Sequence, residues 1–249
     1  MVQVVSNTGP MFATQRQRPL VVELVGLAGA GKTTLSKALT QGNQQVTSKI
    51  ALPRSQMNRH LLLHTLAFLP GHLRHCLHQR WFTREELRGM IYLTAWPEFL
   101  SQPSRRPQRI QLLDLGPIYR LAFLQEFGPP LVKRGRFTQW SQETLRRWSS
   151  VLDLVIWLDA PNAVLLDRIN TRAKDHLVKA RSAAESEVFF TRYRAGFERV
   201  IAQLPAHNGP TILRFDTSKN SVEQILTQVT TVLQQYQSQT GENASNGLD

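Results

Sequence analysis

Short apolar runs alternate with longer stretches of helical pattern along most of the 249-residue chain. The run LDLVIWLDA, residues 152–160, is almost entirely apolar, which is typical of a strand that is covered on both faces. The other runs are residues 20–27, 109–115 and 211–218, with a weaker one at 44–53. This alternation predicts an α/β fold of three layers, in which a central parallel sheet of about five strands has helices on both faces.

Helical periodicity fills much of the chain between these runs. Helices are expected at residues 32–40, 162–172 and 221–236, and Pro161 suits the start of the second. Residues 57–100 have the pattern of an all-helical excursion, which would lie beside the site of an acceptor. Residues from about 172 to 190 are polar, small and charged, so we expect them to form a mobile helical lid.

Both ends of the chain differ from the segment between them. Residues 1–18 are polar, and residues 237–249 (QSQTGENASNGLD) are polar and small. Such compositions are typical of flexible tails, because they offer little apolar surface to bury. A single folded domain is therefore expected at residues 19–236.

Composition narrows the class of protein. Hydrophobic residues make up 41% of the chain, as in ordinary globular proteins. The single cysteine, Cys76, excludes an internal disulfide and suits a reducing compartment. The longest apolar stretch, around residues 61–69, is too short and broken to span a membrane, and the N-terminus has no signal-peptide pattern. We therefore expect a cytoplasmic protein with no membrane partner, whose oligomeric state stays open.

The charge balance favours anionic partners. The formal net charge is +12, from 30 Lys and Arg residues against 18 Asp and Glu residues. The basic residues are spread along the chain, which favours nucleotide phosphates as partners over a nucleic-acid face. A nucleic-acid partner stays open as the less favoured alternative.

The strongest chemical signal is GLAGAGKTT, which matches the phosphate-binding pattern G-x-x-x-x-G-K-[ST] at every fixed position. An apolar strand precedes it and a helical segment follows, as this P-loop requires. Its glycines let backbone N–H groups point at a phosphate, and the following helix adds its positive end. The residues expected to bind the nucleotide are Gly26, Ala28, Gly29, Ala30, Gly31, Lys32, Thr33 and Thr34.

A metal site is expected next to this loop. P-loop enzymes bind Mg²⁺ through the loop hydroxyl and a carboxylate at the end of a neighbouring strand. Thr33 is that hydroxyl, and Asp114 ends the apolar run QLLD. We therefore expect Thr33 and Asp114 to bind Mg²⁺, and Lys32 and Asp114 to serve in catalysis. The alternative is that Asp114 is only a turn residue before Gly116.

Arginines are the candidates for charge neutralisation. Arg168 and Arg172 are four residues apart, so they share one face of the expected helix. Phosphoryl transfer depends on cations around the moving group, which makes both of them catalytic candidates. Arg54 and Arg120 are the candidates for binding an anionic acceptor. The alternative for each of these arginines is a solvated surface position.

These motifs resemble the thymidylate kinase-like branch of the P-loop kinases. The loop is similar to that family's GLDGAGKTT, and LLDLGPIYRL, residues 112–121, resembles its strand ending in Asp-Arg. Residues 153–172, 189–204 and 215–225 resemble its strand and arginine-bearing helix before the lid, its helix after the lid, and its last strand with the following helix start. The resemblance covers residues 20–236. It implies phosphoryl transfer from ATP.

Two positions depart from the family pattern. Ala28 stands where the family has Asp, and Leu115 stands where it has Arg. In the family those two residues help to hold the acceptor nucleotide. The resemblance therefore implies that the ATP side is kept and the acceptor side is altered, so thymidylate is expected to be a poor acceptor.

The sequence as a whole predicts an ATP-dependent phosphotransferase, a kinase that uses ATP and Mg²⁺ on a small anionic or hydroxylated acceptor such as a nucleotide. Two alternatives remain: a non-catalytic or regulatory nucleotide-binding module, and a nucleic-acid-associated ATPase. The chain lacks the Asn-Lys-x-Asp motif that binds guanine, which argues against a GTPase switch.

Overall fold

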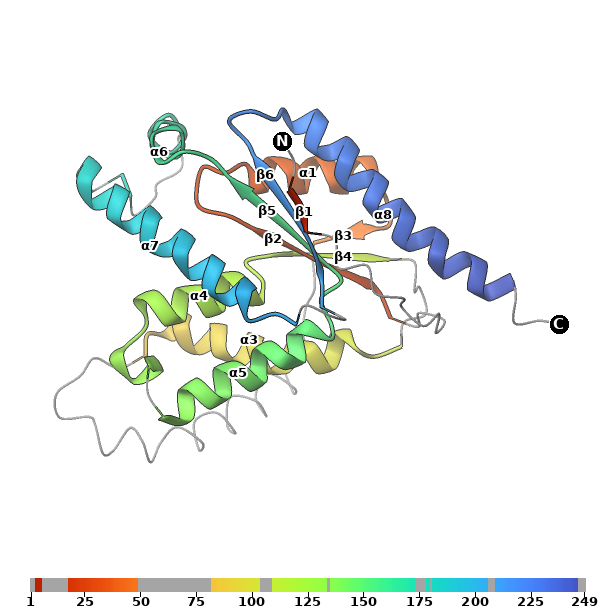
Figure 1. The fold of residues 1–249 in the computed structure, drawn as a ribbon, viewed down its shortest axis with the longest axis horizontal. Coiled ribbons are helices and arrows are strands. Elements are labelled where there is room, and N and C mark those ends of the chain that lie inside the picture. The colour runs from red at the N-terminus through yellow and green to blue at the C-terminus, as the bar shows by residue number, and fades with distance from the viewer. Residues whose placement is uncertain are drawn as a thin grey trace.

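The computed structural model describes residues 3–5, 18–48, 82–103, 109–133, 135–172, 178–179, 181–205 and 209–245. Within these residues the strands form one sheet in the order β1-β6-β5-β2-β4-β3 (Figure 1). All neighbouring pairs are parallel except β1 with β6, so five parallel strands carry one antiparallel edge strand. The strands are β1 Gln3–Val5, β2 Leu20–Val25, β3 Val46–Thr47, β4 Ile110–Asp114, β5 Leu154–Asp159 and β6 Thr211–Asp216.

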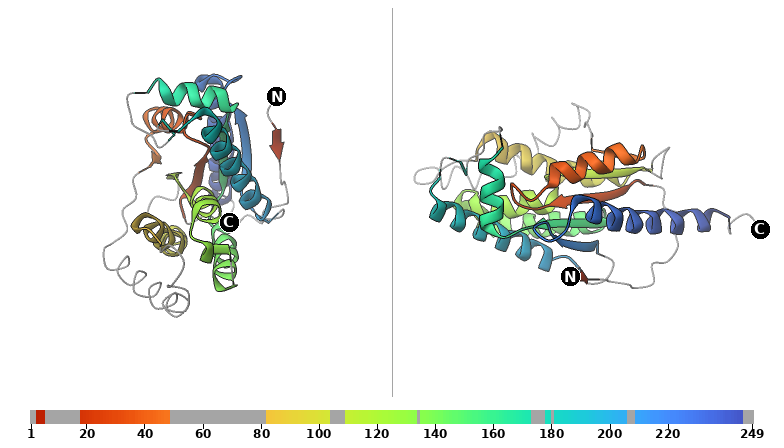
Figure 2. Two further views of the ribbon diagram at one scale, coloured as in Figure 1. Left: turned by 90° about the vertical axis from the view of Figure 1, so that its left-hand side faces the viewer. Right: turned by 90° about the horizontal axis from the view of Figure 1, so that it is seen from above.

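Helices cover both faces of this sheet, which confirms the predicted three-layer α/β fold. In Figure 1, α1 and α8 lie on one side of the strands, while α3, α4, α5 and α7 lie on the other. The left view of Figure 2, which is turned by 90° about the vertical axis, shows the same layers. The helices are α1 Lys32–Gly42, α3 Arg84–Leu100, α4 Pro117–Phe127, α5 Gly135–Ser149, α6 Asn162–Asn170, α7 Ala183–Ala202 and α8 Val222–Ser245, with a short 3₁₀ turn at Pro130–Lys133.

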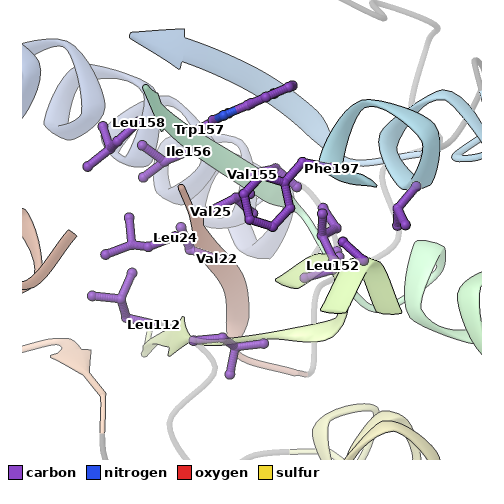
Figure 3. Close-up of a cluster of buried hydrophobic side chains, with 14 of the residues drawn as sticks. Val22, Leu24, Val25, Leu112, Leu152, Val155, Ile156, Trp157, Leu158 and Phe197 are labelled. Atoms are coloured by element: carbon purple, nitrogen blue, oxygen red, sulfur yellow. The ribbon is translucent and has the colours of Figure 1, made fainter. Parts of the chain in front are cut away.

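The core lies on both faces of the central strands. All six residues of β2 are buried, as are the first five of β5. Figure 3 shows Leu24 and Ile156 on one side of the sheet and Val155 on the other, where Phe197 of α7 covers it. A strand that is buried on both faces must be apolar throughout, which explains why the runs at 20–27 and 152–160 were informative.

Secondary structure extends into both segments that the sequence indicated as tails. Strand β1 lies inside residues 1–18 and pairs with β6, and α8 continues to Ser245 instead of ending at 236. A helix can continue past its packed face because each added residue contributes one more backbone hydrogen bond. The boundary expected at 236 was therefore wrong as the end of the last helix.

The expected lid and the helical excursion are described only in part. Helix α7 begins at Ala183, so the last part of the segment from 172 to 190 is regular helix. Residues 173–177 and 180 lie outside the described part, and motion of the lid stays a prediction. Of the excursion at 57–100, residues 84–100 form α3, and residues 57–81 lie outside the described part. None of the helices that the structure describes is long and apolar enough to cross a bilayer.

Candidate functional site

The phosphate loop joins the end of β2 to the start of α1, and it is held tightly by its neighbours. Gly29 has a φ of +88°, and a Cβ atom at this position would lie 2.8 Å from the carbonyl oxygen of Leu165. Gly26 has a φ of +153°, and its Cβ would lie 2.3 Å from the carbonyl oxygen of Leu158. Both the backbone conformation and the close packing require glycine here. The loop therefore rests against β5 and α6.

Lys32 is the first residue of α1, and its side chain points back toward the start of the phosphate loop. Its Nζ donates hydrogen bonds to the carbonyl oxygens of Gly26 at 2.6 Å and Leu27 at 3.0 Å. Burial lowers the pKa of Lys32 to about 8, the nearby Asp114 carboxylate raises it, and Arg172 lowers it further. Lys32 is therefore held against the loop by backbone carbonyls, under the opposing electrostatic influences of Asp114 and Arg172.

Asp114 lies at the carboxyl end of β4, directly beside the strand that leads into the loop. It pairs in register with Leu24 of β2, and its side chain is exposed. Thr33 is also exposed, at the second position of α1. In an open α/β sheet, ligands bind at the carboxyl ends of the strands. A hydroxyl and a carboxylate are hard oxygen ligands, so these two residues fit Mg²⁺ that is shared with nucleotide phosphates.

A cavity of about 300 Å³ opens beside the loop, between α1, α6 and the start of α8. Apolar side chains of Leu158, Val222 and Ile225 form part of its wall, which suits the flat face of a nucleotide base. The full lining is Gly29, Ala30, Gly31, Thr34, Leu35, Leu158, Arg168, Thr171, Arg172, Thr217, Asn220, Val222 and Ile225.

The two arginines of the expected catalytic pair differ in their contacts. The guanidinium group of Arg168 donates to the Thr217 hydroxyl at 2.9 Å, to the Thr217 carbonyl at 2.8 Å and to the Gly29 carbonyl at 3.3 Å. These contacts tie α6 to the phosphate loop and to the turn after β6. Arg172, which follows α6, is exposed and lines the same cavity. Arg168 therefore holds the wall of the cavity together, whereas the exposed side chain of Arg172 is available to a ligand.

A buried glutamate was missed by the sequence analysis. Glu23 lies in the middle of β2 and is fully buried. Its carboxylate accepts hydrogen bonds from the backbone N–H of Ile118 at 3.1 Å and of Tyr119 at 3.0 Å. Burial raises the pKa of Glu23 to about 8, against the lowering effect of these N–H groups and of Arg120. A charged residue inside the apolar run LVVELV was the signal in the sequence, because such a residue is rarely buried without a specific partner.

Arg120 lies on α4 near this glutamate. Its guanidinium carbon is 4.4 Å from the centre of the Tyr92 ring on α3, and the group also packs against Gly89. Within the part of the chain that the structure describes, its buried Nε has no hydrogen-bond partner. Arg120 therefore has capacity to bind an anion. Arg54, the other acceptor candidate, lies outside the described residues.

A second hollow, of about 750 Å³, lies at the carboxyl ends of β5 and β6, away from the phosphate loop. Its two arginines are already engaged: Arg194 bonds the Asp159 carboxylate at 2.8 and 3.1 Å, and Arg214 bonds Glu198 at 3.1 Å. The smaller cavity, which has the glycine loop and Arg172 in its wall, is the better nucleotide site.

Comparisons with known proteins give structural resemblances only. No protein-family model matches the chain, and no curated protein matches it. The chain is similar in structure to YorR protein from Bacillus subtilis in complex with phosphorylated GDP, with 10% identity, a TM-score of 0.49, and coverage of 86% of this chain and 95% of that one. It is similar to a thymidylate kinase from Candida albicans, with 14% identity, a TM-score of 0.49, and coverage of 89% and 94%. It is also similar to a deoxyadenosine kinase from M. mycoides with bound dATP, with 15% identity, a TM-score of 0.44, and coverage of 86% and 99%.

Proposed function

We propose that the protein is an ATP-dependent phosphotransferase, which moves the terminal phosphoryl group of ATP to a small anionic or hydroxylated acceptor. One observation carries the proposal: the glycine loop leads into the positive end of α1, where Lys32 lies over the loop carbonyls, and Arg172 lines the cavity beside the same loop. Phosphoryl transfer is mainly positioning plus neutralisation of charge on the moving group, and these residues are suited to both.

Each residue has a defined part in this scheme. Lys32 exchanges its contacts with the loop carbonyls for the outer phosphates of ATP. Thr33 and Asp114 would hold Mg²⁺, which when bound supplies charge neutralisation at the phosphates. Arg172 neutralises charge that develops on the transferred group, and Arg168 keeps the loop and the cavity wall in place.

The acceptor side is the part of the site that differs from the resembled family. Leu115 is exposed and Ala28 is half-buried, and neither can bind a phosphate through its side chain. Arg120 on α4 is our candidate for binding the negative charge of the acceptor. Arg54 is a second candidate, from the sequence alone. Thymidylate is expected to be a poor acceptor, with a kcat/KM below about 10⁴ M⁻¹s⁻¹.

The test is a screen of ADP release from Mg·ATP in the presence of nucleosides, nucleotides and sugars. Acceptor-dependent ADP release supports the proposal, and efficient release with thymidylate would contradict the expected change of acceptor. Saturable ATP binding without turnover on any acceptor would favour a regulatory nucleotide-binding module, which the two altered acceptor positions make the second candidate.

A further inference from the structure

Helix α4 begins without a cap of its own. Its N-cap residue is Gly116, which has no side chain, and its first residue is Pro117, which has no N–H group. The first N–H groups that need an acceptor are those of Ile118 and Tyr119. Both donate to the side-chain carboxyl group of Glu23, one to each oxygen. Glu23 lies on β2, 95 and 96 residues earlier in the chain.

The same carboxyl group also packs against the turn between β4 and α4. A Cβ atom on Gly116 would lie 2.6 Å from the carboxyl carbon of Glu23, so the turn is packed directly against the glutamate. Immediately before it, Leu115 has a φ of 62°, a left-handed conformation that is unfavourable for leucine. Strained backbone next to a functional group persists only where surrounding contacts hold it. Glu23 contacts the residues that directly follow Leu115, namely Gly116, Ile118 and Tyr119.

This turn connects two residues of the candidate site. Asp114 is the last residue before it, and Arg120 lies in the first turn of α4, where its backbone N–H bonds the Gly116 carbonyl at 3.1 Å. We propose that Glu23 is a positioning residue, which holds the turn from Asp114 to Gly116 so that the Asp114 carboxylate faces the phosphate loop. This inference rests on the proposed function, in which Asp114 binds Mg²⁺.

The test measures binding, with no need for an acceptor. A non-hydrolysable ATP analogue is titrated into the full chain with excess Mg²⁺ and again with EDTA, and the ratio of the two affinities gives the Mg²⁺ enhancement. In Glu23→Gln one side-chain oxygen becomes an amide N–H group that cannot accept from helix α4. We expect the enhancement to fall by about tenfold, a loss of about 1.4 kcal/mol, while affinity in EDTA stays within about threefold.

Two further variants make the comparison specific. Gly116→Ala disturbs the same contact from the side of the turn, because its new methyl group would collide with Glu23. It should reduce the Mg²⁺ enhancement by a similar factor. This variant provides the test if Glu23→Gln does not fold. Asp153→Asn is the matched control, because Asp153 is also a buried carboxylate that accepts a backbone N–H, from Val21 at 2.8 Å, near the opposite end of β2. It should leave the enhancement unchanged.

Asp114→Asn separates the two proposals. If it abolishes the Mg²⁺ enhancement while Glu23→Gln and Gly116→Ala retain it, the positioning role of Glu23 is overturned and the metal assignment stands. If Asp114→Asn itself retains the full enhancement, the metal assignment in the proposed function is wrong, and the role given to Glu23 is overturned with it.

Discussion

At the scale of single residues, Gly29 is the point where the phosphate loop and α6 approach each other most closely. In Gly29→Ala the new methyl group would meet the Leu165 carbonyl at 2.8 Å while φ stays at +88°. We expect the free energy of unfolding to drop by about 2–4 kcal/mol, from strain and overpacking together. Chemical denaturation measures this change.

A matched control for that substitution lies on the adjoining helix. Gly42 ends α1, and a Cβ atom there would have nothing within 4 Å. Gly42→Ala should be neutral or should stabilise the protein by up to about 1 kcal/mol. Equal effects of the two alanines would contradict the tight contact between the loop and α6.

Glu23 gives a prediction about pH. Its pKa is raised by burial from the ordinary value of 4.5 to about 8. The folded protein therefore keeps this proton at pH values where the unfolded chain has released it. From about pH 5 to 8 this group makes the folded state less stable as pH rises, with a slope approaching about 1.4 kcal/mol per pH unit.

Glu23→Gln removes this titration. The free energy of unfolding of the variant should therefore rise relative to that of the wild type as pH increases from about 5 to 8. Denaturant melts of both proteins across this range test the point, and parallel pH dependences would show that Glu23 does not titrate there.

At the scale of elements, α6 ends at Asn170 and not at 172 as expected, so Arg168 lies on the helix and Arg172 lies just after it. We expect the two arginines to have different tasks. Arg172 is exposed, so Arg172→Ala should lower kcat by on the order of 10²-fold and change ATP affinity little. Arg168 bonds both the phosphate loop and Thr217, so Arg168→Ala should weaken ATP binding as well as kcat.

Separate measurement of ATP affinity and turnover distinguishes the two arginines. Arg168→Lys cannot reproduce the forked contacts and should not restore binding. The control is the exposed Arg146 on α5, whose side chain pairs with its helix neighbour Glu143. Arg146→Ala should cause no loss of ATP affinity or turnover. Similar profiles for Arg168→Ala and Arg172→Ala would contradict the division of roles.

The central strands had a clear signal in the sequence, whereas the two edge strands had a weak one or none. Strands β2, β4 and β5 lie within the predicted runs, because their burial requires continuous apolar residues. Strand β6 also lies within a predicted run, although only Leu213 and Phe215 are buried in it. Strand β3 lies within the weaker run predicted at 44–53 but is only two residues long, and β1 was missed, because an edge strand has few buried positions to mark it. The extent of α8 was underestimated since its last turns have no apolar face.

The same reasoning explains which site residues were predictable. The phosphate loop has a local pattern, and Asp114 could be placed because it ends an apolar strand. The role of Glu23 could not be predicted, because its partners are separated from it by 95 and 96 residues and no local spacing marks them. The contacts of Arg168 with Gly29 and Thr217 likewise join segments that only the fold brings together.

At the scale of the whole molecule, the strand order determines where chemistry can occur. Strands β4 and β5 lie on opposite sides of β2 in the sheet. Asp114, at the end of β4, therefore lies on one side of the phosphate loop, and the β5–α6 connection lies on the other. One side of the loop then holds the cavity for a nucleotide, and the other side holds Asp114, Glu23 and Arg120. Under the proposed function, ATP would bind on the cavity side and the acceptor on the side of Asp114 and Arg120.

The most direct test of the central claim follows the terminal phosphate of labelled ATP in the wild type and in Lys32→Ala, with Mg²⁺ and a panel of acceptors. The account predicts that the wild type transfers label to an acceptor and that folded Lys32→Ala loses at least about 10²-fold of this activity. Lys37→Ala, an exposed change on the same helix, should retain it. Unchanged transfer in folded Lys32→Ala, or no transfer to any acceptor by the wild type, would contradict the account.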